Sequence, residues 1–405
     1  MDQHRLSPFG SPTSAPYQRM AALFDAINTS TRDIPPPRLR AAVEQLSLGL
    51  SRSRSSMVLK DYLASPLSQA AYCVHFLPWN VYRLCLAWQS SPMQNLGPER
   101  ALHDWGAGPM TGLIALWVQT GLEGSNTLAS YTAVERQRDI LDMGESLAGM
   151  LGIDKLVTIH SHPHALSFDE EPSQEKADIL LVSQSFNEWL PPRGRSTEPI
   201  RAFAKHARAH VKTDGELFLM EPASRVVSWG VMELRNMLAE SATILAPCTH
   251  AASCPLLDPR LKSWCHFRRR IVPHPLHGKL RGALPPEREA VSYSYLHARF
   301  TPPEHTKEQR FALARVISEP FSIEDGRGVY GCSAQGRILM ATRSRRWSQP
   351  LIDALAPDSV ASYPRQGKHP RDKKSRALKI WLSDCRKPDG SRYGAPAPAK
   401  KDNPS

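Results

Sequence analysis

The first residues with chemical potential form a glycine turn at residues 104–108, with the sequence D-W-G-A-G. Glycines are needed there because the backbone must bend sharply and pass close to a bound molecule. The pattern D-x-G-x-G is common in enzymes that use S-adenosylmethionine, where the acid and the turn backbone hold the amino-acid part of the cofactor. Glu135 lies 29 residues after Gly106, at the end of the next strand-like run, where an acid takes the ribose hydroxyls. We therefore expect the cofactor to be held by Asp104, Gly106, Gly108 and Glu135.

Two bulky side chains limit what this turn predicts. Met110 falls where many methyltransferases have a third glycine, and Trp105 lies inside the turn. Both side chains are large enough to crowd a bound cofactor. The alternative interpretation is a tight strand-to-helix turn followed by a surface Glu135. The turn indicates a nucleotide-binding domain and leaves cofactor binding and turnover open.

A second group of reactive side chains consists of cysteines. Three of them follow one another with the spacing C-x5-C-x10-C, at Cys248, Cys254 and Cys265. Thiolates bind soft metal ions, and a metal site needs about four ligands. Cys332 is the best fourth ligand, because it lies where strand-like segments return. The spacing lacks the C-x2-C knuckle of most structural zinc sites, so two alternatives stay open: cysteines without a metal, or zinc bound by two cysteines with His250 or His266.

Taken together, these motifs resemble a known family, the methyltransferase-like ribosomal small-subunit assembly proteins of mitochondria and their bacterial relatives. The resemblance covers about residues 95–345 and is carried by the segments D-W-G-A-G-P (104–109), S-F-N-E-W (185–189), L-M-E-P (219–222), A-P-C-T-H (246–250), C-P-L (254–256) and W-C-H-F (264–267). The cysteine segment is the most specific part, because generic methyltransferases lack it. The family implies a class I methyltransferase fold, association with the small ribosomal subunit and a four-iron, four-sulfur (4Fe-4S) cluster. Carried over by position, the cluster ligands are Cys248, Cys254, Cys265 and Cys332, and the resemblance favours this iron–sulfur cluster over zinc.

The segment S-F-N-E at 185–188 follows a buried strand-like run, where methyltransferases of this fold often place residues on the substrate side. Asn187 could hydrogen-bond a target base, and Glu188 could serve as a base. An equally simple interpretation is a helix cap in which Asn187 satisfies backbone donors. Glu221, at the end of the next strand-like run, is ambiguous in the same way. No catalytic residue is assigned.

The elements that must position these residues alternate along the middle of the chain. Strands are predicted at 100–105, 130–134, 156–160, 177–184 and 215–220, and helices at 111–120, 199–211 and 225–239. This alternation predicts a mostly parallel sheet with covered faces, and so an α/β, class I methyltransferase (Rossmann-like) fold. Helical spacing at 39–50 and 58–88, with a break near Pro78, predicts a helical N-terminal region. Strand-like segments return at 291–300, 311–316, 328–332 and 338–342.

We expect five parts in the chain. They are a disordered N-terminus (1–37), a helical region (38–94), the methyltransferase-like Rossmann domain (95–245), a Cys-rich metal-binding insertion with closing strands (246–345) and a basic C-terminal tail (346–405).

The charge of the chain predicts a polyanionic partner. The formal net charge is +12, and twelve Lys and Arg face four Asp between Arg365 and the end. Lys and Arg gain affinity by releasing counterions from phosphates, which favours RNA over the alternative of a tail that only aids solubility. Arg268, Arg269 and Arg270 form a second basic cluster that is expected to meet RNA phosphates. With the resemblance, the expected partner is the ribosomal small subunit or its rRNA.

The location of the protein is predicted from what the sequence lacks. No run of eighteen apolar residues predicts a membrane span, and residues 1–20 lack the apolar core of a secretory signal. Features of a mitochondrial presequence are weak, so we expect a bacterial cytoplasmic protein, with the mitochondrial matrix as the alternative. The expected function is that of an RNA-associated methyltransferase-like protein in small-subunit assembly or translation. An active S-adenosylmethionine-dependent RNA methyltransferase is the alternative, and a small-molecule methyltransferase is the third.

Overall fold

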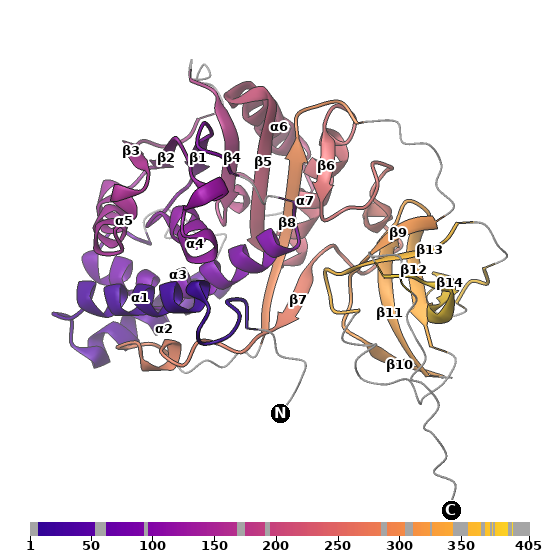
Figure 1. Cartoon of the computed structure of the whole chain (residues 1–405), viewed down its shortest axis with the longest axis horizontal. Helices are drawn as coiled ribbons and strands as arrows, with labels where there is room; N and C mark the ends of the chain where they lie inside the picture. Colours follow the sequence, from indigo (N-terminus) through magenta and orange to yellow (C-terminus); the bar gives the residue numbers. More distant parts are fainter. Residues whose placement is uncertain are drawn as a thin grey trace, which may run out of the picture.

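The alternating strands and helices of the middle of the chain form one mixed sheet (Figure 1). The computed structural model describes residues 7–52, 62–92, 96–167, 175–190, 195–284, 290–303, 311–324, 326–342, 355–365, 369–372, 375, 377–387 and 391. In these ranges the first sheet has the order β3-β2-β1-β4-β5-β8-β6, with β7 beside β8. Its strands are β1 (Ala101–Trp105), β2 (Ser130–Glu135), β3 (Thr158–Pro163), β4 (Ala177–Ser183), β5 (Val211–Pro222), β6 (Thr243–Ala246), β7 (Phe267–Arg270) and β8 (Ala290–Arg299).

Strands β1 to β5 run parallel, and β8 is antiparallel to β5, β6 and β7. The order 3-2-1-4-5 changes direction between β1 and β4. In doubly wound sheets, ligands bind at such a switch point, outside the carboxyl ends of the strands. The glycine turn follows β1 at this point. The structure thus confirms the predicted α/β fold with a mixed sheet.

Helices cover both faces of the sheet, because the strand residues alternate between two apolar cores. Leu181 of β4 belongs to the core under α3 (Pro66–Gln89), α4 (Thr111–Thr120) and α5 (Arg138–Met150), while Leu180 and Val182 face α6 (Glu198–His210) and α7 (Arg225–Leu238). Helix α3 continues through Pro78, where the sequence predicts a break. Most of its side chains are buried, so tertiary packing outweighs the hydrogen bond that proline removes. No helix in the described ranges is long and apolar enough to cross a membrane.

The N-terminal stretch differs from its prediction. The sequence predicts disorder for residues 1–37, but the structure has α1 (Ala15–Ser30) and the start of α2 (Pro36–Arg52) there. One face of α1 is fully buried and carries apolar residues at helical spacing: Met20, Leu23, Phe24 and Ile27. Arg19 fixes the helix further, because its Nε donates to the carbonyl of Val118 at 3.0 Å. This helix therefore belongs to the layer that covers the glycine-turn side of the sheet.

The C-terminal part of the chain forms a second sheet of six strands. Its order is β13-β9-β11-β12-β14, with β10 beside β11. The strands are β9 (Phe311–Val316), β10 (Phe321–Ile323), β11 (Gly326–Ser333), β12 (Gly336–Ala341), β13 (Val360–Pro364) and β14 (Leu378–Trp381). A bridge between Ser362 of β13 and Arg386, just past β14, joins the two edge strands of this sheet. The sheet thereby closes around a separate apolar core, and we call it the barrel. The stretch 346–405, which the sequence predicts as a basic tail, thus supplies two strands of this barrel.

Buried polar contacts join the barrel to the first sheet. Asp358, fully buried, accepts hydrogen bonds from the hydroxyls of Tyr293 (3.3 Å) and Tyr295 (2.9 Å) on β8. Arg315 of β9 pairs with the same carboxylate at 3.3 Å. The buried cation and the two hydroxyls offset the cost of burying this charge. The barrel is thereby held at a fixed place beside β8.

The basic cluster on β7 also contributes to this junction. Arg268 and Arg270 pair with Glu319, and Nη1 of Arg269 donates to the carbonyl of Pro357 at 2.9 Å. The sequence predicts that these arginines meet RNA phosphates. In the structure they have partners on the barrel side and help to join the two sheets, and their contact with RNA stays a prediction.

Candidate cofactor turn and cysteine cluster

The glycine turn lies between the carboxyl ends of β1, β2 and β4. Gly106 (φ +70°) and Gly108 (φ +53°) both have the left-handed backbone that favours glycine. A Cβ on Gly106 would lie 2.4 Å from Cβ of Ser185, so the turn also needs glycine for close approach to the loop after β4. The backbone N–H groups of Gly106 and Ala107 both donate to the carbonyl of Val134 on β2. The predicted turn is therefore present and tightly held.

Asp104 lies beneath this turn rather than on its surface. The carboxyl is buried, and its Oδ2 accepts a hydrogen bond of 2.6 Å from the hydroxyl of Tyr131. Burial raises the pKa of Asp104 to about 7, although the Tyr131 hydrogen bond lowers it. Among the described residues, Oδ1 of Asp104 has no hydrogen-bond partner. An unpaired buried oxygen is costly, and a donor from a bound amino group would satisfy it.

Glu135 ends β2, as the sequence predicts, and is half-buried. Its Oε2 accepts from the backbone N–H of Gly108 at 3.1 Å, and its Oε1 accepts from that of Gln137 at 3.3 Å. Each carboxylate oxygen has a second lone pair, so Glu135 can still accept a hydroxyl. Asp104, Gly106, Gly108 and Glu135 are thus brought together around one turn.

Met110 is fully buried and takes the left-handed conformation (φ 56°) at the start of α4. Its side chain is packed beneath α5, where a Cβ on Gly144 would lie 2.8 Å from Cγ of Met110. Trp105 points to the opposite core, where its ring contacts Phe203, His206 and His210. Of the two bulky residues, only Met110 therefore lies on the side of the sheet that α4 and α5 cover.

The segment after β4 has mainly structural contacts. Asn187 donates from Nδ2 to the carbonyl of Gln184 and to Oε2 of Glu221, both at 2.8 Å. Oε1 of Glu221 accepts from the backbone N–H of Phe186 at 2.8 Å, and Glu221 is fully buried. Glu221 accepts from this backbone donor, and Asn187 itself donates, so its contacts differ from those of the predicted cap in which Asn187 satisfies backbone donors.

Three of the predicted metal ligands are arranged along one helix, α7. Nε of Arg235 donates to Sγ of Cys248 at 3.2 Å, and Oδ1 of Asn236 accepts from the backbone N–H of Cys254 at 2.9 Å. One turn earlier, Sδ of Met232 accepts from the N–H of Cys265 at 3.4 Å. Positions i, i+3 and i+4 of a helix share a face, so α7 acts as a template for the cysteine segment.

Cys332, the predicted fourth ligand, lies on β11 of the barrel. It lies on β11 opposite Arg315 of β9, and Nε of Arg315 donates to the carbonyl of Pro247 at 2.7 Å, next to Cys248. Burial raises the pKa of Cys332 well above its usual value, and negative charge on Cys248 and Cys254 raises it further. The predicted fourth ligand therefore lies on the barrel side of the junction, across from Pro247 and Cys248.

Cys265 is affected by all three other cysteines. Burial raises the pKa of its thiol well above the usual value, and the charges of Cys248, Cys254 and Cys332 each raise it further. Burial likewise raises the pKa of Cys254 to about 11. The charges of the four cysteines that the sequence selects thus act on one another, and their arrangement as metal ligands stays a prediction. Cys73, Cys85 and Cys385 are buried elsewhere.

Each kind of metal site requires its own spacing between the ligand sulfurs. In the described part of the chain, no group of three or more His, Cys, Asp or Glu side chains is placed to hold a metal ion. A tetrahedral zinc site, with Zn–S bonds of about 2.3 Å, requires its sulfurs to be nearly in contact. The ligands of a polynuclear cluster bind different metal atoms and lie farther apart. A metal site at the four cysteines therefore stays a prediction.

Arg235 is the functional residue that the sequence analysis missed. It is 2% exposed, and within the described ranges its guanidinium pairs with no carboxylate. It donates instead to Cys248 and to the carbonyls of His250 and Ala252. A buried cation without an anion is costly, so its place beside the thiols fits a negatively charged thiolate centre. An arginine on the apolar face of an amphipathic helix was the available signal.

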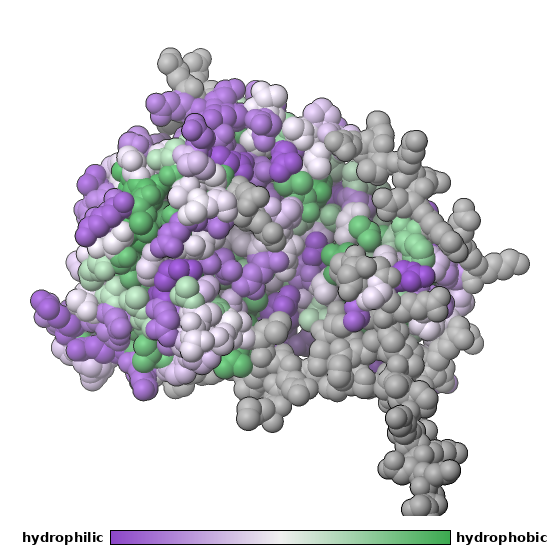
Figure 2. Space-filling model, in the orientation of Figure 1, coloured by the Kyte–Doolittle hydropathy of each residue, from purple (hydrophilic) through white to green (hydrophobic). Residues whose placement is uncertain are grey.

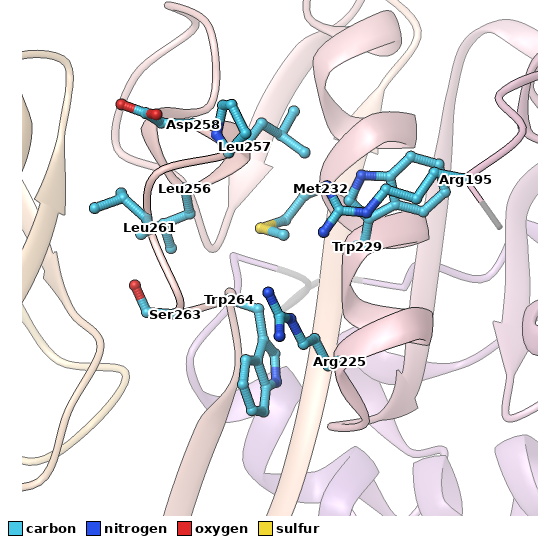
Figure 3. Close-up of a pocket in the computed structure, with 11 residues that line it drawn as sticks. Arg195, Arg225, Trp229, Met232, Leu256, Leu257, Asp258, Leu261, Ser263 and Trp264 are labelled. Atoms are coloured by element: carbon cyan, nitrogen blue, oxygen red, sulfur yellow. The ribbon is translucent and has the colours of Figure 1, made fainter.

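An open cleft adjoins the cysteine segment (Figure 3). It has about 300 Å³ of empty space and lies between α7 and residues 256–264. Arg225 and Trp264 lie side by side at one end, and Asp258 lies at the other. Trp264 is anchored by its Nε1, which donates to the carbonyl of Ala223 at 2.9 Å. The cleft therefore belongs to the cysteine segment and is not a pocket of the glycine turn.

Comparison with known proteins decides the family. Residues 67–346 match the family described as mitochondrial small ribosomal subunit Rsm22. The chain belongs to this family. The match to Rsm22 includes the glycine turn and the four clustered cysteines, and it ends before β13 and β14. No curated protein matches the chain at a significant level.

Solved structures match the chain at low identity and low TM-score. A Pyrococcus horikoshii protein assigned as an RNA methyltransferase is 15% identical, over 64% of this chain and 99% of that chain, with a TM-score of 0.33. TrmK of M. capricolum, in complex with S-adenosyl-homocysteine, is 12% identical over 55% of this chain and 71% of its own, with a TM-score of 0.30. The ribosomal protein L11 methylase of Lactobacillus delbrueckii subsp. bulgaricus is 15% identical over 41% and 70%, with a TM-score of 0.27. Matches with such low TM-scores carry no argument about fold or function.

Proposed function

We propose that this member of the Rsm22 family is an RNA-associated, methyltransferase-like protein that acts on the small ribosomal subunit, in its assembly or in translation. The family match supports the partner, and the net charge of +12 supports contact with RNA. The family's name favours the mitochondrial matrix as the location, and the bacterial cytoplasm is the alternative. The test is co-sedimentation of the tagged protein with small-subunit particles from its own source. Its absence from small-subunit and precursor fractions contradicts the proposal.

We further propose that Cys248, Cys254, Cys265 and Cys332 hold an iron–sulfur cluster of the 4Fe-4S type. The observation that supports this is that Cys248, Cys254 and Cys265 are held along α7 beside the buried Arg235, while Cys332 lies on β11 across the junction. The cluster would supply a structural link between the cysteine segment and the barrel, and binding would be coupled to local folding. Helix α7 would position three of the cysteines, and Arg235 would compensate the negative charge of the thiolates.

Metal analysis of protein purified without air tests the cluster. We expect iron and acid-labile sulfide in equal amounts and broad visible absorption, all lost in Cys265→Ser. Cys73→Ser is the matched control, because Cys73 is buried on α3, where its Sγ donates to Sδ of Met143 on α5. Stoichiometric zinc without iron supports the zinc alternative, and a colourless protein without either metal contradicts metal binding altogether.

A second candidate function, S-adenosylmethionine-dependent methylation of RNA, is supported by one observation, the unpaired Oδ1 of Asp104. Asp104 and the turn backbone would hold the amino-acid part of the cofactor, and Glu135 the ribose. The bound cofactor would supply an activated methyl group. Isothermal titration calorimetry tests this. Binding that Asp104→Ala abolishes, and that Asp33→Ala at an exposed site leaves unchanged, supports an enzyme. No heat of binding in the wild type supports a protein that acts without methyl transfer.

A further inference from the structure

The barrel has the topology of a fold that binds oligonucleotides. Strands β9, β11 and β12 pair in succession as an antiparallel meander. Strand β14 then runs parallel to β12, and β13 runs antiparallel to β9. The bridge between Ser362 and Arg386 joins β13 to the end of β14, so the order closes on itself. Five strands in this order form an OB-fold, which binds oligonucleotides across its second and third strands. Here these are β11 and β12.

The outer face of these strands carries aromatic side chains. Val329, Ile338 and Ile380 point into the barrel core, so the alternate residues point outward. Phe321, Tyr330 and Trp381 are half-buried on that outer side, around Leu339. The rings of Phe321 and Tyr330 lie 4.8 Å apart. We call Phe321, Tyr330 and Trp381 the aromatic platform.

Two positively charged side chains lie over rings of the aromatic platform. The guanidinium of Arg337 lies over the Tyr330 ring at 4.7 Å, and Nζ of Lys379 lies over the Trp381 ring at 4.5 Å. Lys379 lies beside Leu339 in the sheet, and Arg337 lies two residues before Leu339 on β12, so both cations are on the outer face. In Figure 2, apolar patches lie beside hydrophilic side chains on the barrel side of the molecule. Residues 311–387 carry fifteen Lys and Arg against seven Asp and Glu, a surplus of eight.

We propose that the aromatic platform binds single-stranded RNA, with bases stacked on Phe321, Tyr330 and Trp381 and phosphates neutralised by Arg337 and Lys379. Stacking requires unpaired bases, because the faces of paired bases are covered by their neighbours in a duplex. The charge surplus selects a polyanion over an apolar peptide as the occupant. This inference rests on the proposed association with RNA and adds a module that the family match does not include in full, since that match ends at residue 346.

Fluorescence anisotropy with the full-length protein tests the platform. The probe is a labelled 12-nucleotide uridine oligomer, with the same length of duplex RNA for comparison. Base–aromatic stacking contributes about 1–3 kcal/mol per base, so we expect Phe321→Ala and Tyr330→Ala each to weaken binding about 5- to 150-fold. Tyr330→Phe keeps the ring and is expected to retain near-wild-type affinity. Thermal unfolding of each variant separates lost contacts from lost folding.

The cations are tested by the dependence of binding on salt. Lys379→Ala removes one phosphate contact, so the slope of log K against log salt should fall by about 0.7. Arg32→Ala is the matched control, because it removes one charge at an exposed site on the far side of the fold. An unchanged slope in Lys379→Ala, or an equal change in Arg32→Ala, contradicts the role of Lys379.

Three outcomes overturn the platform. They are wild-type affinity in both alanine variants, preference for the duplex, and no binding of the oligomer by the wild type. Co-sedimentation of the same variants with small-subunit particles keeps the two proposals distinct. A variant that binds the oligomer normally but no longer co-sediments with small-subunit particles shows that the platform contacts a protein. That outcome also overturns the inference. Loss of oligomer binding with retained co-sedimentation supports the platform and leaves the proposed function standing.

Discussion

At the scale of single residues, the buried carboxylate of Asp104 lowers the free energy of unfolding of the ligand-free protein. Its pKa is raised to about 7 by burial, from an ordinary value of 3.8. The folded state therefore favours the neutral acid, and stability falls as the pH rises from about 4 to about 7, because the unfolded chain releases the proton first. We expect Asp104→Asn to stabilise the ligand-free protein at pH 8 by about 2–4 kcal/mol. Urea unfolding at pH 5 and pH 8 measures this.

The gain in Asp104→Asn should shrink toward pH 5, where the wild-type carboxyl is also mostly protonated when folded. Asp33→Asn, at a position that is 93% exposed, should change nothing at either pH. Equal stability of the wild type and Asp104→Asn at pH 8 contradicts the expectation. A residue that lowers stability when empty is what a ligand-binding acid would be, so this measurement also bears on the cofactor.

A second residue, Glu216, has the opposite shift. Burial raises its pKa, but His297 at 3.0 Å and Arg299 at 2.8 Å outweigh burial and lower the pKa to about 2. Its contribution to stability is complete above the ordinary value near 4.5 and is lost as the pH falls from there to about 2. We expect Glu216→Gln to lose about 2–3 kcal/mol at pH 7 and clearly less at pH 3. Glu240→Gln, at an exposed site, is the control for denaturant unfolding.

Residue types and spacing predicted the acids, the glycines and the cysteines, because each of these is needed for its own chemistry. The partners of these residues could not be predicted in the same way. Tyr131 comes under Asp104 only through the register of β2 with β1, and Arg235 reaches Cys248 from another element. Such contacts depend on tertiary packing, which one sequence does not show.

At the scale of elements, α5 packs closely against the residues at the start of α4. A Cβ on Gly144 would lie 2.8 Å from both Cγ of Met110 and the backbone carbon of Pro109. Because the backbone there cannot move easily, we expect Gly144→Ala to destabilise the protein by about 1–3 kcal/mol. Gly49→Ala in α2 is the matched control, since nothing lies within 4 Å of its Cβ. That change should stabilise by about 0.5–1 kcal/mol through helix propensity. Thermal melts that rank the two variants the other way contradict this packing.

Elements with a strong local pattern were predicted well. Helix α4 occupies the predicted residues 111–120, and the predicted strands 130–134 and 177–184 correspond to β2 and β4. Helix α1 was missed although its buried face has helical spacing, because serines and prolines around it favour disorder. Strands β13 and β14 are short and lie within a basic stretch. They become strands only when the barrel closes, and that contact joins residues far apart in sequence.

At the scale of the whole molecule, two sheets share one junction. Asp358 and Arg315 join the barrel to β8 on one side, and Cys332 brings the barrel to the cysteine segment on the other. A cluster bound by all four cysteines would connect the α/β domain to the barrel through covalent bonds to the metal. The barrel also carries the aromatic platform, so the cluster would fix the orientation of one RNA-binding surface relative to the other domain.

Limited proteolysis can test whether the cluster joins the two sheets. A bound cluster should slow the separation of the barrel from the first sheet, and so slow cleavage between them. We expect Cys332→Ser to lose iron and to be cut between the two sheets about tenfold faster than the wild type, which corresponds to about 1.4 kcal/mol of lost docking energy. Cys385→Ala is the matched control, since Cys385 is also buried in the barrel but faces its own core. It should keep its iron and its wild-type cleavage rate at the junction. If Cys332→Ser keeps its iron, or loses it without faster cleavage, the metal does not join the two sheets, and the barrel is held by the contacts of Asp358, Arg315 and the β7 arginines.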